Sequence, residues 1–324
     1  MFKDEELSLV AGGSGFIGTN LCEYLLNKGK KVICLDNQFT GSINNIKKFE
    51  SNSNFDVIYH DIIEPIYIRA SEIYNLACPA SPIHYQYDPK RTLMTSIVGT
   101  NNLLDLALET GAKFFQASTS EIYGDPDVHP QPEDYWGNVN PFGPRSCYDE
   151  GKRCGETLCY IYKKKYPHLE ISIGRIFNTY GPCMSANDGR VISNFINEAI
   201  NNEDITIYGD GLQTRSFCYV DDLVEVIYRL IQSGAAVDLP VNIGNPDEHT
   251  ILDIANKIIE LTDSRSKIIH LDLPQDDPKR RRPDIQRAKD LLDWEPRVSL
   301  ELGLTQTIKY FEDLKNGSSE RDAA

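Results

Sequence analysis

The sequence predicts a doubly wound α/β fold, in which helices cover both faces of a parallel sheet, followed by a smaller C-terminal lobe. Three observations predict it. Short apolar runs alternate with helical patterns through the first half of the chain, a glycine-rich turn separates the first strand from the first helix, and the later part is punctuated by proline and glycine. We expect residues 1–177 to form the first lobe and residues 178–324 mainly the second, with some exchange of chain between them.

Each element follows from the local pattern, in chain order. Strands are expected at 7–12, 31–36, 55–61, 72–77, 113–118 and 170–177, which are short apolar runs. Helices are expected at 16–28, 92–110, 145–165, 190–201, 221–233, 250–262 and 301–314. Strands that alternate with helices in this way pair in parallel, because the chain crosses over between them.

Composition and charge limit the possible partners. The 324 residues carry a net charge of −15, which argues against nucleic acid or an anionic membrane as the main partner. No apolar run approaches the ~20 residues of a membrane span, and the acidic start "MFKDEELSLV" is unlike a secretory signal. The eight cysteines form no C-x-x-C pair and no zinc-type spacing with histidine, so we expect free buried thiols, no metal and a reducing cytoplasm.

The glycine-rich turn predicts a dinucleotide site. "GGSGFIG" places Gly12, Gly15 and Gly18 directly after a strand and at the start of a helix, where backbone N–H groups and the helix dipole favour a pyrophosphate. The next strand ends at Asp36, and a carboxylate there binds ribose hydroxyls and repels a 2′-phosphate, which favours NAD over NADP. Asp61 suits either the adenine edge or a turn. The alternative is a glycine turn that only packs helix against strand.

Two further motifs predict acid–base chemistry. "CYDEGKR" places Tyr148 and Lys152 four residues apart, hence on one face of a helix, and a neighbouring ammonium would lower the pKa of the phenol toward neutrality. "ASTSEIYG" ends a buried strand with three hydroxyl groups and a carboxylate, which are costly to bury without partners. The alternative for the first motif is a tyrosine and a lysine that merely face solvent, and for "KRRR" (279–282) it is a solvated run of charge.

Together these motifs resemble the extended short-chain dehydrogenase/reductases, also called the NAD-dependent epimerase/dehydratase family, whose sheet is of the Rossmann type. The segments "LDNQFTG", "ACPASPIHYQYDP", "ASTSEIYGDP", "YWGNVNPFGPRSCYDEGKR", "RIFNTYGP" and "YGDGLQTRSFCYVDDL" more closely resemble the UDP-glucuronate decarboxylases, or UDP-xylose synthases. The similarity covers roughly residues 7–314. It implies NAD as the cofactor, UDP-glucuronate as the substrate and a homodimer as the assembly.

The resemblance also implies site residues. Those implied for catalysis are Tyr148, Lys152, Thr119, Ser120, Glu121 and Arg281. Those implied for NAD are Gly12, Gly15, Phe16, Ile17, Gly18, Asp36, Asn37, Phe39, Thr40, Gly41, Asp61, Ile62, Leu76, Ala77, Thr95, Tyr148, Lys152 and Thr179. Those implied for the UDP-sugar are Asn178, Arg190, Asn194, Phe195, Tyr208, Arg215 and Arg281.

The implied reaction is redox-neutral. Tyr148 removes the proton of the sugar 4-OH as NAD⁺ takes the hydride from C4, with Thr119 and Lys152 completing the triad. The resulting 4-ketone makes the sugar acid a β-keto acid, so loss of CO₂ leaves an enolate that oriented donors stabilise. Protonation at C5 and return of the hydride give UDP-xylose and restore the cofactor. Ser118 is expected to pair with backbone or cofactor.

Glu121 and Arg281 each keep two roles open. Glu121 either disfavours the substrate carboxylate by like charge or orients ring hydroxyls or a proton-carrying water. Arg281 either binds the carboxylate or donates a proton at C5 through a water.

Related activities differ at the strand end. The 4,6-dehydratases carry Thr-Asp-Glu where this chain carries Thr119, Ser120 and Glu121, and a serine is too weak an acid for loss of water. Hexose 4-epimerases generally lack the glutamate, and UDP-apiose/xylose synthases tend to carry cysteine at position 120. The main alternative is the bacterial aminoarabinose-pathway decarboxylase, which shares the pattern but releases the 4-keto-pentose and NADH. The other is a catalytically dead sensor, although such proteins typically lose the tyrosine or the lysine.

Three positions depart from the family pattern. Ala11 replaces the usual threonine, and Met94 and Cys183 stand where close relatives carry basic residues, so contact with the diphosphate or a helix end is expected to be weaker. The helices at 92–110 and 145–165 are the candidates for a dimer interface. The outer-face candidates on them are Leu103, Leu106, Leu158 and Tyr162, which equally suit the core.

Overall fold

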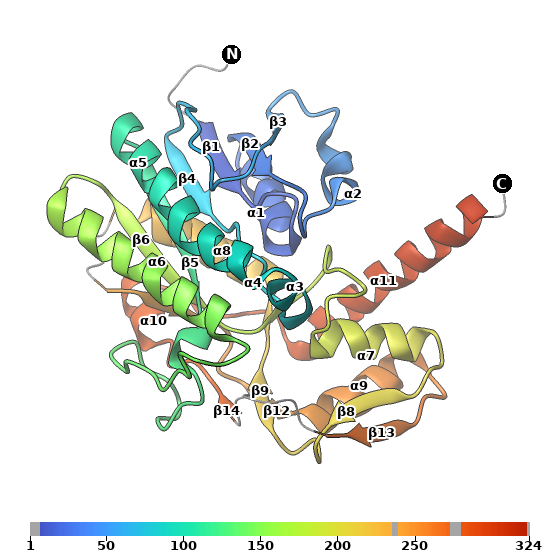
Figure 1. Ribbon diagram of the computed structural model, residues 1–324. Coiled ribbons are helices and arrows are strands. Elements are labelled where there is room, and N and C mark those ends of the chain that lie inside the picture. The colour runs from blue at the N-terminus through green and yellow to red at the C-terminus, as the bar shows by residue number, and fades with distance from the viewer. Residues whose placement is uncertain (1–6, 235–238, 273–279, 323–324) are drawn as a thin grey trace.

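The computed structural model describes residues 7–234, 239–272 and 280–322, and a seven-stranded parallel sheet lies at its centre (Figure 1). The sheet order is β11-β6-β5-β4-β1-β2-β3. Its strands are β1 (Leu7–Ala11), β2 (Lys31–Asp36), β3 (Phe55–Tyr59), β4 (Glu72–Asn75), β5 (Lys113–Thr119), β6 (Ile171–Ile176) and β11 (Val241–Ile243). The six strands predicted from sequence are confirmed, and the seventh comes from the later half of the chain and pairs with β6.

Helices cover both faces of this sheet, as predicted. On one face α1 (Phe16–Asn27) packs against α8 (Val220–Gln232), and on the other α5 (Thr100–Thr110) runs beside α6 (Ser146–Lys165) (Figure 1). Successive side chains of a strand point to opposite faces. Along β1, Val10 therefore joins the core cluster that contains the α1 and α8 residues, while Leu9 joins the one that contains Leu103 and Leu106.

Apart from β11, α8 and α10 (Gln286–Leu292), the described residues after β6 form short strands and three helices. The helices are α7 (Val191–Ile200), α9 (Ile251–Thr262) and α11 (Leu300–Asp322). The strands are β7 (Thr179–Tyr180), β8 (Ile205–Tyr208), β9 (Thr214–Ser216), β10 (Cys218–Tyr219), β12 (Glu248–Thr250), β13 (Ile268–Leu271) and β14 (Arg280–Arg281). In the three-stranded sheet β12-β9-β14, the parallel pairing of β14 with β9 sets Arg281 opposite Arg215. A late segment of the chain thereby lies beside β9.

Several boundaries differ from the sequence prediction. The helix expected at 92–110 is α4 (Pro89–Met94), a π-helical turn (Thr95–Gly99) and then α5. The last helix continues to Asp322 instead of ending at 314. The elements that were not predicted are α2 (Ile43–Ile46), α3 (Pro82–Tyr87), α10 (Gln286–Leu292), the 3₁₀ turns Lys47–Phe49 and Ser120–Tyr123, and the short strands after β6. Elements of two to seven residues are too short to display a period.

The order of the strands reverses between β1 and β4. Such a reversal opens a crevice at the carboxyl ends of the strands, where doubly wound sheets bind ligands. Within the described ranges, no helix is both long and apolar enough to span a membrane.

Candidate active site

One large cavity, with a volume of about 920 Å³, opens at this reversal and continues to residues of α7, β8 and β9. The predicted catalytic residues, the predicted NAD residues and the predicted UDP-sugar residues all line it. The segments that carry them range from the turn after β1 to β14, so the fold brings together residues from across the chain. The solvated-run alternative for Arg281 is wrong, because this side chain is buried; Lys279 lies outside the described residues.

The turn after β1 fits a dinucleotide phosphate. Gly15 is the N-cap of α1, and among the described residues no side-chain capping hydrogen bond is made at this helix start. A Cβ added at Gly15 would meet only the Gly12 carbonyl oxygen, at 3.3 Å, so it would project into the cavity that Gly15 lines. At Gly18 a Cβ would lie 2.0 Å from the same oxygen, which makes this glycine necessary for the turn itself. The helix end is therefore free to receive an anion.

Asp36 and Asp61 are both held by the chain. Asp36 accepts hydrogen bonds from the backbone N–H groups of Ser14 (3.0 Å) and Gln38 (2.8 Å), which orients its carboxylate at the cavity. Asp61 forms an ion pair with Arg91 at 2.5 Å. Partial burial opposes ionisation of Asp61, but hydrogen bonds from Ile63, Asn37 and Arg91 outweigh it and lower the pKa of the carboxyl. The carboxylate of Asp61 is thus paired with Arg91, and this ion pair was not predicted.

Replacing Gly15 by valine is expected to weaken NAD binding at least tenfold, about 1.4 kcal/mol, because the new side chain occupies the phosphate position. The N-cap φ of −75° is open to any residue, so the fold should survive. Titration with NAD, with the Kd for UDP as the internal control, measures the effect. Equal NAD affinity in the variant and the parent would contradict this placement.

The predicted triad is assembled, but the electrostatics differ from the prediction. Tyr148 is buried next to Thr119, and the ring of Tyr85 stacks on it at 5.1 Å between centroids. Burial raises the pKa of Tyr148, the thiol of Cys78 adds to this, and the hydroxyl of Thr119 opposes it. The prediction that the pKa of Tyr148 falls toward neutrality is therefore wrong for the described chain, because burial outweighs the opposing causes. The Lys152 Nζ lies 5.7 Å from the ring centroid and donates to the carbonyl of Ala117 at 3.0 Å.

Glu121 forms ion pairs with two arginines. Arg281 donates from Nη1 to Oε1 at 2.6 Å and from Nη2 to Oε2 at 2.8 Å, and Arg145 Nη2 lies 2.8 Å from Oε2. Burial alone would raise the pKa of Glu121, but the charges of Arg281 and then Arg145 lower it to about 2. Glu121 therefore stays ionised at neutral pH, and the three groups carry one net positive charge beside Tyr148.

Asp149 is a second buried carboxyl next to this cluster. Its Oδ1 has no hydrogen-bond partner within the part of the chain that the structure describes. Burial and then the charge of Glu121 raise the pKa of Asp149 to about 7, against the opposing effect of Arg145. Since the folded state holds this proton more tightly than the unfolded state, the free energy of unfolding falls as the pH rises from 3.8 to about 7.

Replacing Asp149 by asparagine should remove this pH-dependent cost. We expect the variant to gain about 1–3 kcal/mol relative to the parent at pH 8 and little at about pH 4. Chemical unfolding at the two pH values measures the difference, with Asp313→Asn on the exposed surface of α11 as the control. The same pH dependence in both variants would show that Asp149 is ionised throughout.

The predicted UDP-sugar residues line the same cavity. Arg190 donates to the carbonyl of Ala80 at 2.9 Å and pairs with Asp188 at 3.3 Å, while Arg215 is buried and donates to the carbonyl of Thr214. Cys183 and Met94 stand where close relatives carry basic residues. Cys183 lines this cavity, whereas Met94 is not among the lining residues.

Sequence reasoning missed several lining residues. Arg145 lies three positions before Tyr148, one helical turn away, and this spacing was the signal for it. Tyr85 lies within the quoted segment "ACPASPIHYQYDP", but its stack on Tyr148 has no sequence signal. Ser118 donates to Glu156 at 2.5 Å, which corrects the expected backbone or cofactor partner.

The thiols and acidic groups show no metal centre in the ranges that the structure describes. No group of three or more histidine, cysteine, aspartate or glutamate side chains is arranged to hold an ion there. The eight cysteines are free. Cys22, Cys34, Cys159, Cys183 and Cys218 are buried, Cys78 and Cys147 are half-buried and Cys154 is exposed.

The chain is similar to known proteins over nearly its whole length. A family model described as GDP-mannose 4,6 dehydratase matches residues 9–307. UDP-glucuronic acid decarboxylase 1 of Danio rerio is 53% identical over 309 residues, which cover 95% of this chain and 73% of that protein. UDP-glucuronic acid decarboxylase 4 of Arabidopsis thaliana is 50% identical over 316 residues, which cover 98% and 71%.

A solved structure resembles the fold closely. The UDP-glucuronic acid 4-epimerase of Bacillus cereus, in complex with UDP-glucuronic acid and NAD, superposes with a TM-score of 0.84 at 30% identity, and the match covers 95% of this chain and 99% of that one.

Proposed function

The chain belongs to the UDP-glucuronic acid decarboxylases, within the extended short-chain dehydrogenase/reductases, and on that premise we propose that it converts UDP-glucuronate to UDP-xylose and CO₂ with NAD held throughout. The observation that carries the proposal is the Thr119–Tyr148–Lys152 triad in one cavity with the Glu121–Arg281–Arg145 cluster. A dehydrogenase-type triad beside a surplus positive charge suits a sugar that must be oxidised and that carries a carboxylate.

The triad handles the proton of the sugar 4-OH. NAD⁺, when bound, supplies the acceptor for the hydride of C4. Tyr148 Oη takes the hydroxyl proton, and the hydroxyl of Thr119 beside that phenol favours the phenolate against the cost of burial. Lys152 is held on the Ala117 carbonyl and lines the same cavity as Tyr148, and we assign it to the ribose of the cofactor. The same phenol and the Thr119 hydroxyl are oriented donors for the enolate that loss of CO₂ leaves.

The cluster recognises the sugar carboxylate. With its pKa near 2, Glu121 carries no proton to give at neutral pH, so we assign it the task of holding both arginines in place. Arg281 and Arg145 then present one net positive charge to the substrate carboxylate. This task differs from both roles left open for Glu121, which were repulsion of the substrate carboxylate and orientation of ring hydroxyls or a water. It selects a uronic acid over a neutral hexose.

The two lobes divide the ligands. We propose that residues 1–177 hold NAD, through the Gly12–Gly18 turn and Asp36, and that residues 178–324 mainly hold the UDP moiety, through Asn178, Arg190 and Arg215. The strand order supports this division, because the reversal between β1 and β4 is the place where doubly wound sheets bind ligands.

Product analysis tests the function. Incubation of the protein with NAD and UDP-glucuronate, followed by proton NMR, is expected to give UDP-xylose and CO₂ without net change of absorbance at 340 nm. Stoichiometric NADH with a UDP-4-keto-pentose would establish the oxidative decarboxylase instead. Binding of both NAD and UDP-glucuronate without turnover would support the alternative of a catalytically dead sensor.

Assembly and compartment extend the proposal. A homodimer through α5 and α6 is supported by the exposed Tyr160 and Ile161 on α6 and Val98 before α5. Leu103 and Leu106 belong to the core instead. Light scattering at micromolar concentration tests it, with Ile161→Glu expected to give monomers. The free thiols support a reducing cytoplasm.

A further inference from the structure

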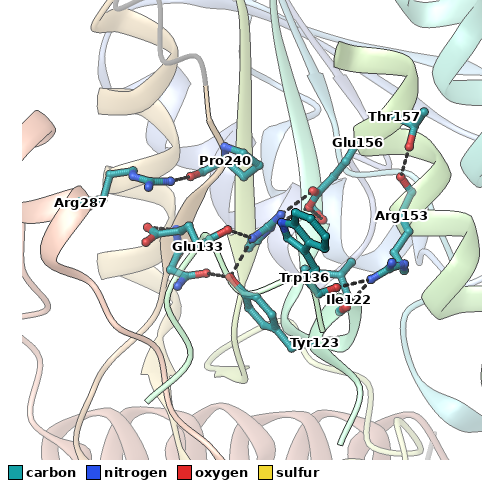
Figure 2. A network of polar contacts seen from close by, with 12 residues as sticks. Ile122, Tyr123, Glu133, Trp136, Arg153, Glu156, Thr157, Pro240 and Arg287 are labelled. Atoms are coloured by element: carbon teal, nitrogen blue, oxygen red, sulfur yellow. Dashed lines mark hydrogen bonds and ion pairs between the residues drawn. The ribbon is translucent and has the colours of Figure 1, made fainter. Parts of the chain in front are cut away.

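A buried hydrogen-bond network lies behind the catalytic strand end and reaches both backbone segments that carry the Glu121–Arg281 pair. We call it the anchoring network; its members are Tyr123, Gln131, Glu156, Arg175 and Asn242. Figure 2 shows Tyr123 and Glu156 pointing toward one another from separate segments. None of the five is among the residues that line the cavity, so any influence on catalysis runs through their neighbours.

Arg175 of β6 and Glu156 of α6 form the charged centre of the network. The guanidinium donates from Nε to Oε1 at 2.9 Å and from Nη2 to Oε2 at 2.8 Å, and both side chains are largely buried. Glu156 also accepts from Ser118, next to Thr119 of the triad. Because a bidentate pair fixes the plane of the guanidinium, the remaining nitrogen, Nη1, is directed to Tyr123.

Tyr123 ties the turn that carries Glu121 to this centre. Its hydroxyl accepts from Arg175 Nη1 at 2.9 Å and donates to Asn242 Oδ1 at 2.7 Å (Figure 2). Burial raises the pKa of Tyr123 to about 12, so the phenol remains a donor at neutral pH. Glu121 lies two residues earlier, in the same 3₁₀ turn (Ser120–Tyr123).

Asn242 of β11 extends the network to the late segment of the chain. Its Nδ2 donates to the carbonyl of Gln131 at 2.9 Å and to the carbonyl of Asp284 at 3.0 Å, and its backbone N–H donates to Glu133 Oε1 at 2.9 Å. Asn242 is fully buried, so each of these bonds replaces one that water would otherwise supply.

Gln131 completes the link to Arg281. Its backbone N–H donates to the Arg282 carbonyl at 2.9 Å, and its Oε1 accepts from the Arg282 N–H at 2.9 Å. Its own carbonyl accepts from the Asp284 N–H at 3.0 Å. Arg281 is the residue before Arg282, so the segment that carries Arg281 is fixed by the same network that fixes the turn carrying Glu121.

We propose that Asn242 and Tyr123 are positioning residues, which hold the backbone of Arg281 and that of Glu121 in register so that the two side chains form their fork in the active site. Both ends of the fork are held within one or two residues of the network, and displacement by about 1 Å can cost about 100-fold in rate. Tests of this inference that measure turnover of UDP-glucuronate rest on the proposed decarboxylase function.

Two substitutions test the proposal. Tyr123→Phe keeps the ring and removes the hydroxyl that joins Arg175 to Asn242, and Asn242→Asp turns the donor to two carbonyls into an acceptor. Each is expected to lower kcat about 10- to 100-fold while the Kd for UDP changes by less than about twofold. Ser172→Ala, on the same strand as Arg175, removes a buried hydrogen bond to Leu230 instead and serves as the matched control.

A double-mutant cycle separates positioning from a general loss of stability. In an Arg281→Ala background, Tyr123→Phe should lower kcat by no more than about threefold, because its effect runs through Arg281. The proposal is overturned if both variants keep kcat within about twofold of the parent, or if Tyr123→Phe costs the same factor with and without Arg281.

A crystal structure of Tyr123→Phe tests the inference apart from the activity. We expect at least one of the two Arg281–Glu121 contacts, 2.6 and 2.8 Å in the parent, to be lost. An unchanged fork would overturn the positioning role. Failure of the parent to release CO₂ from UDP-glucuronate would reject the proposed function and leave this structural test intact.

Discussion

Replacing Tyr148 by phenylalanine is expected to lower the rate of CO₂ release from UDP-glucuronate at least about 1,000-fold. The phenol is the group in the cavity that stands beside Thr119 and Lys152, and without it the proton of the 4-OH has no acceptor in the triad. The first chemical step therefore fails, and with it the ketone that makes decarboxylation possible. Released CO₂ from substrate labelled in the carboxylate measures the rate.

The substitution should leave binding intact. Phenylalanine preserves the stack with Tyr85, so we expect the Kd values for UDP and NAD to change by less than about threefold. Tyr59→Phe, at an exposed position on β3, is the control and should retain full activity. Turnover of the Tyr148 variant within tenfold of the parent would contradict its role as the base.

Replacing Glu121 by glutamine is expected to lower kcat about 100- to 1,000-fold. The amide keeps the size of the side chain but removes the charge between Arg281 and Arg145, which then repel each other in a buried site. The orientation of both guanidiniums toward the substrate is lost. Steady-state turnover with UDP-glucuronate measures kcat, and calorimetry with UDP measures nucleotide binding, which should persist.

The same variant carries a pH signature. Because the folded pKa of Glu121 is depressed to about 2, its stabilising effect is fully present above its ordinary value of 4.5 and is lost as the pH falls toward 2. The Tm of Glu121→Gln should therefore be lower than that of the parent at pH 7, with the difference shrinking below pH 4.5. Glu150→Gln, whose partner Arg153 is half-exposed, is the control. A kcat within about threefold of the parent for Glu121→Gln would contradict the assigned role.

Much of the fold follows from local pattern. The six predicted strands and the long helices have runs of apolar residues long enough to be recognised, and the glycine turn indicates the ligand edge of the sheet. The π-helical turn at Thr95–Gly99 was hidden inside a continuous helical pattern. Gly99 lies where a Cβ would come within 2.4 Å of Ile62 Cδ1, a close approach set by a distant segment.

The site was predicted as a set of residues but not as a set of contacts. Glu121 and Arg281 are 160 positions apart, and their bidentate pairing depends on how β14 docks beside β9. The pKa of Tyr148 is governed by burial, which a spacing of four residues on a helix does not reveal. Arg145 needed the tertiary structure to show that it shares Glu121 with Arg281.

The most direct test of the redox-neutral reaction follows the hydrogen on C4. UDP-glucuronate deuterated at C4 is incubated with the protein and unlabelled NAD, and the product is examined by NMR. We predict UDP-xylose that retains the deuterium at C4, because the atom removed in the first step is returned in the last while the cofactor stays bound. Protium at C4, or deuterium found in free NADH beside a keto sugar, would contradict the account.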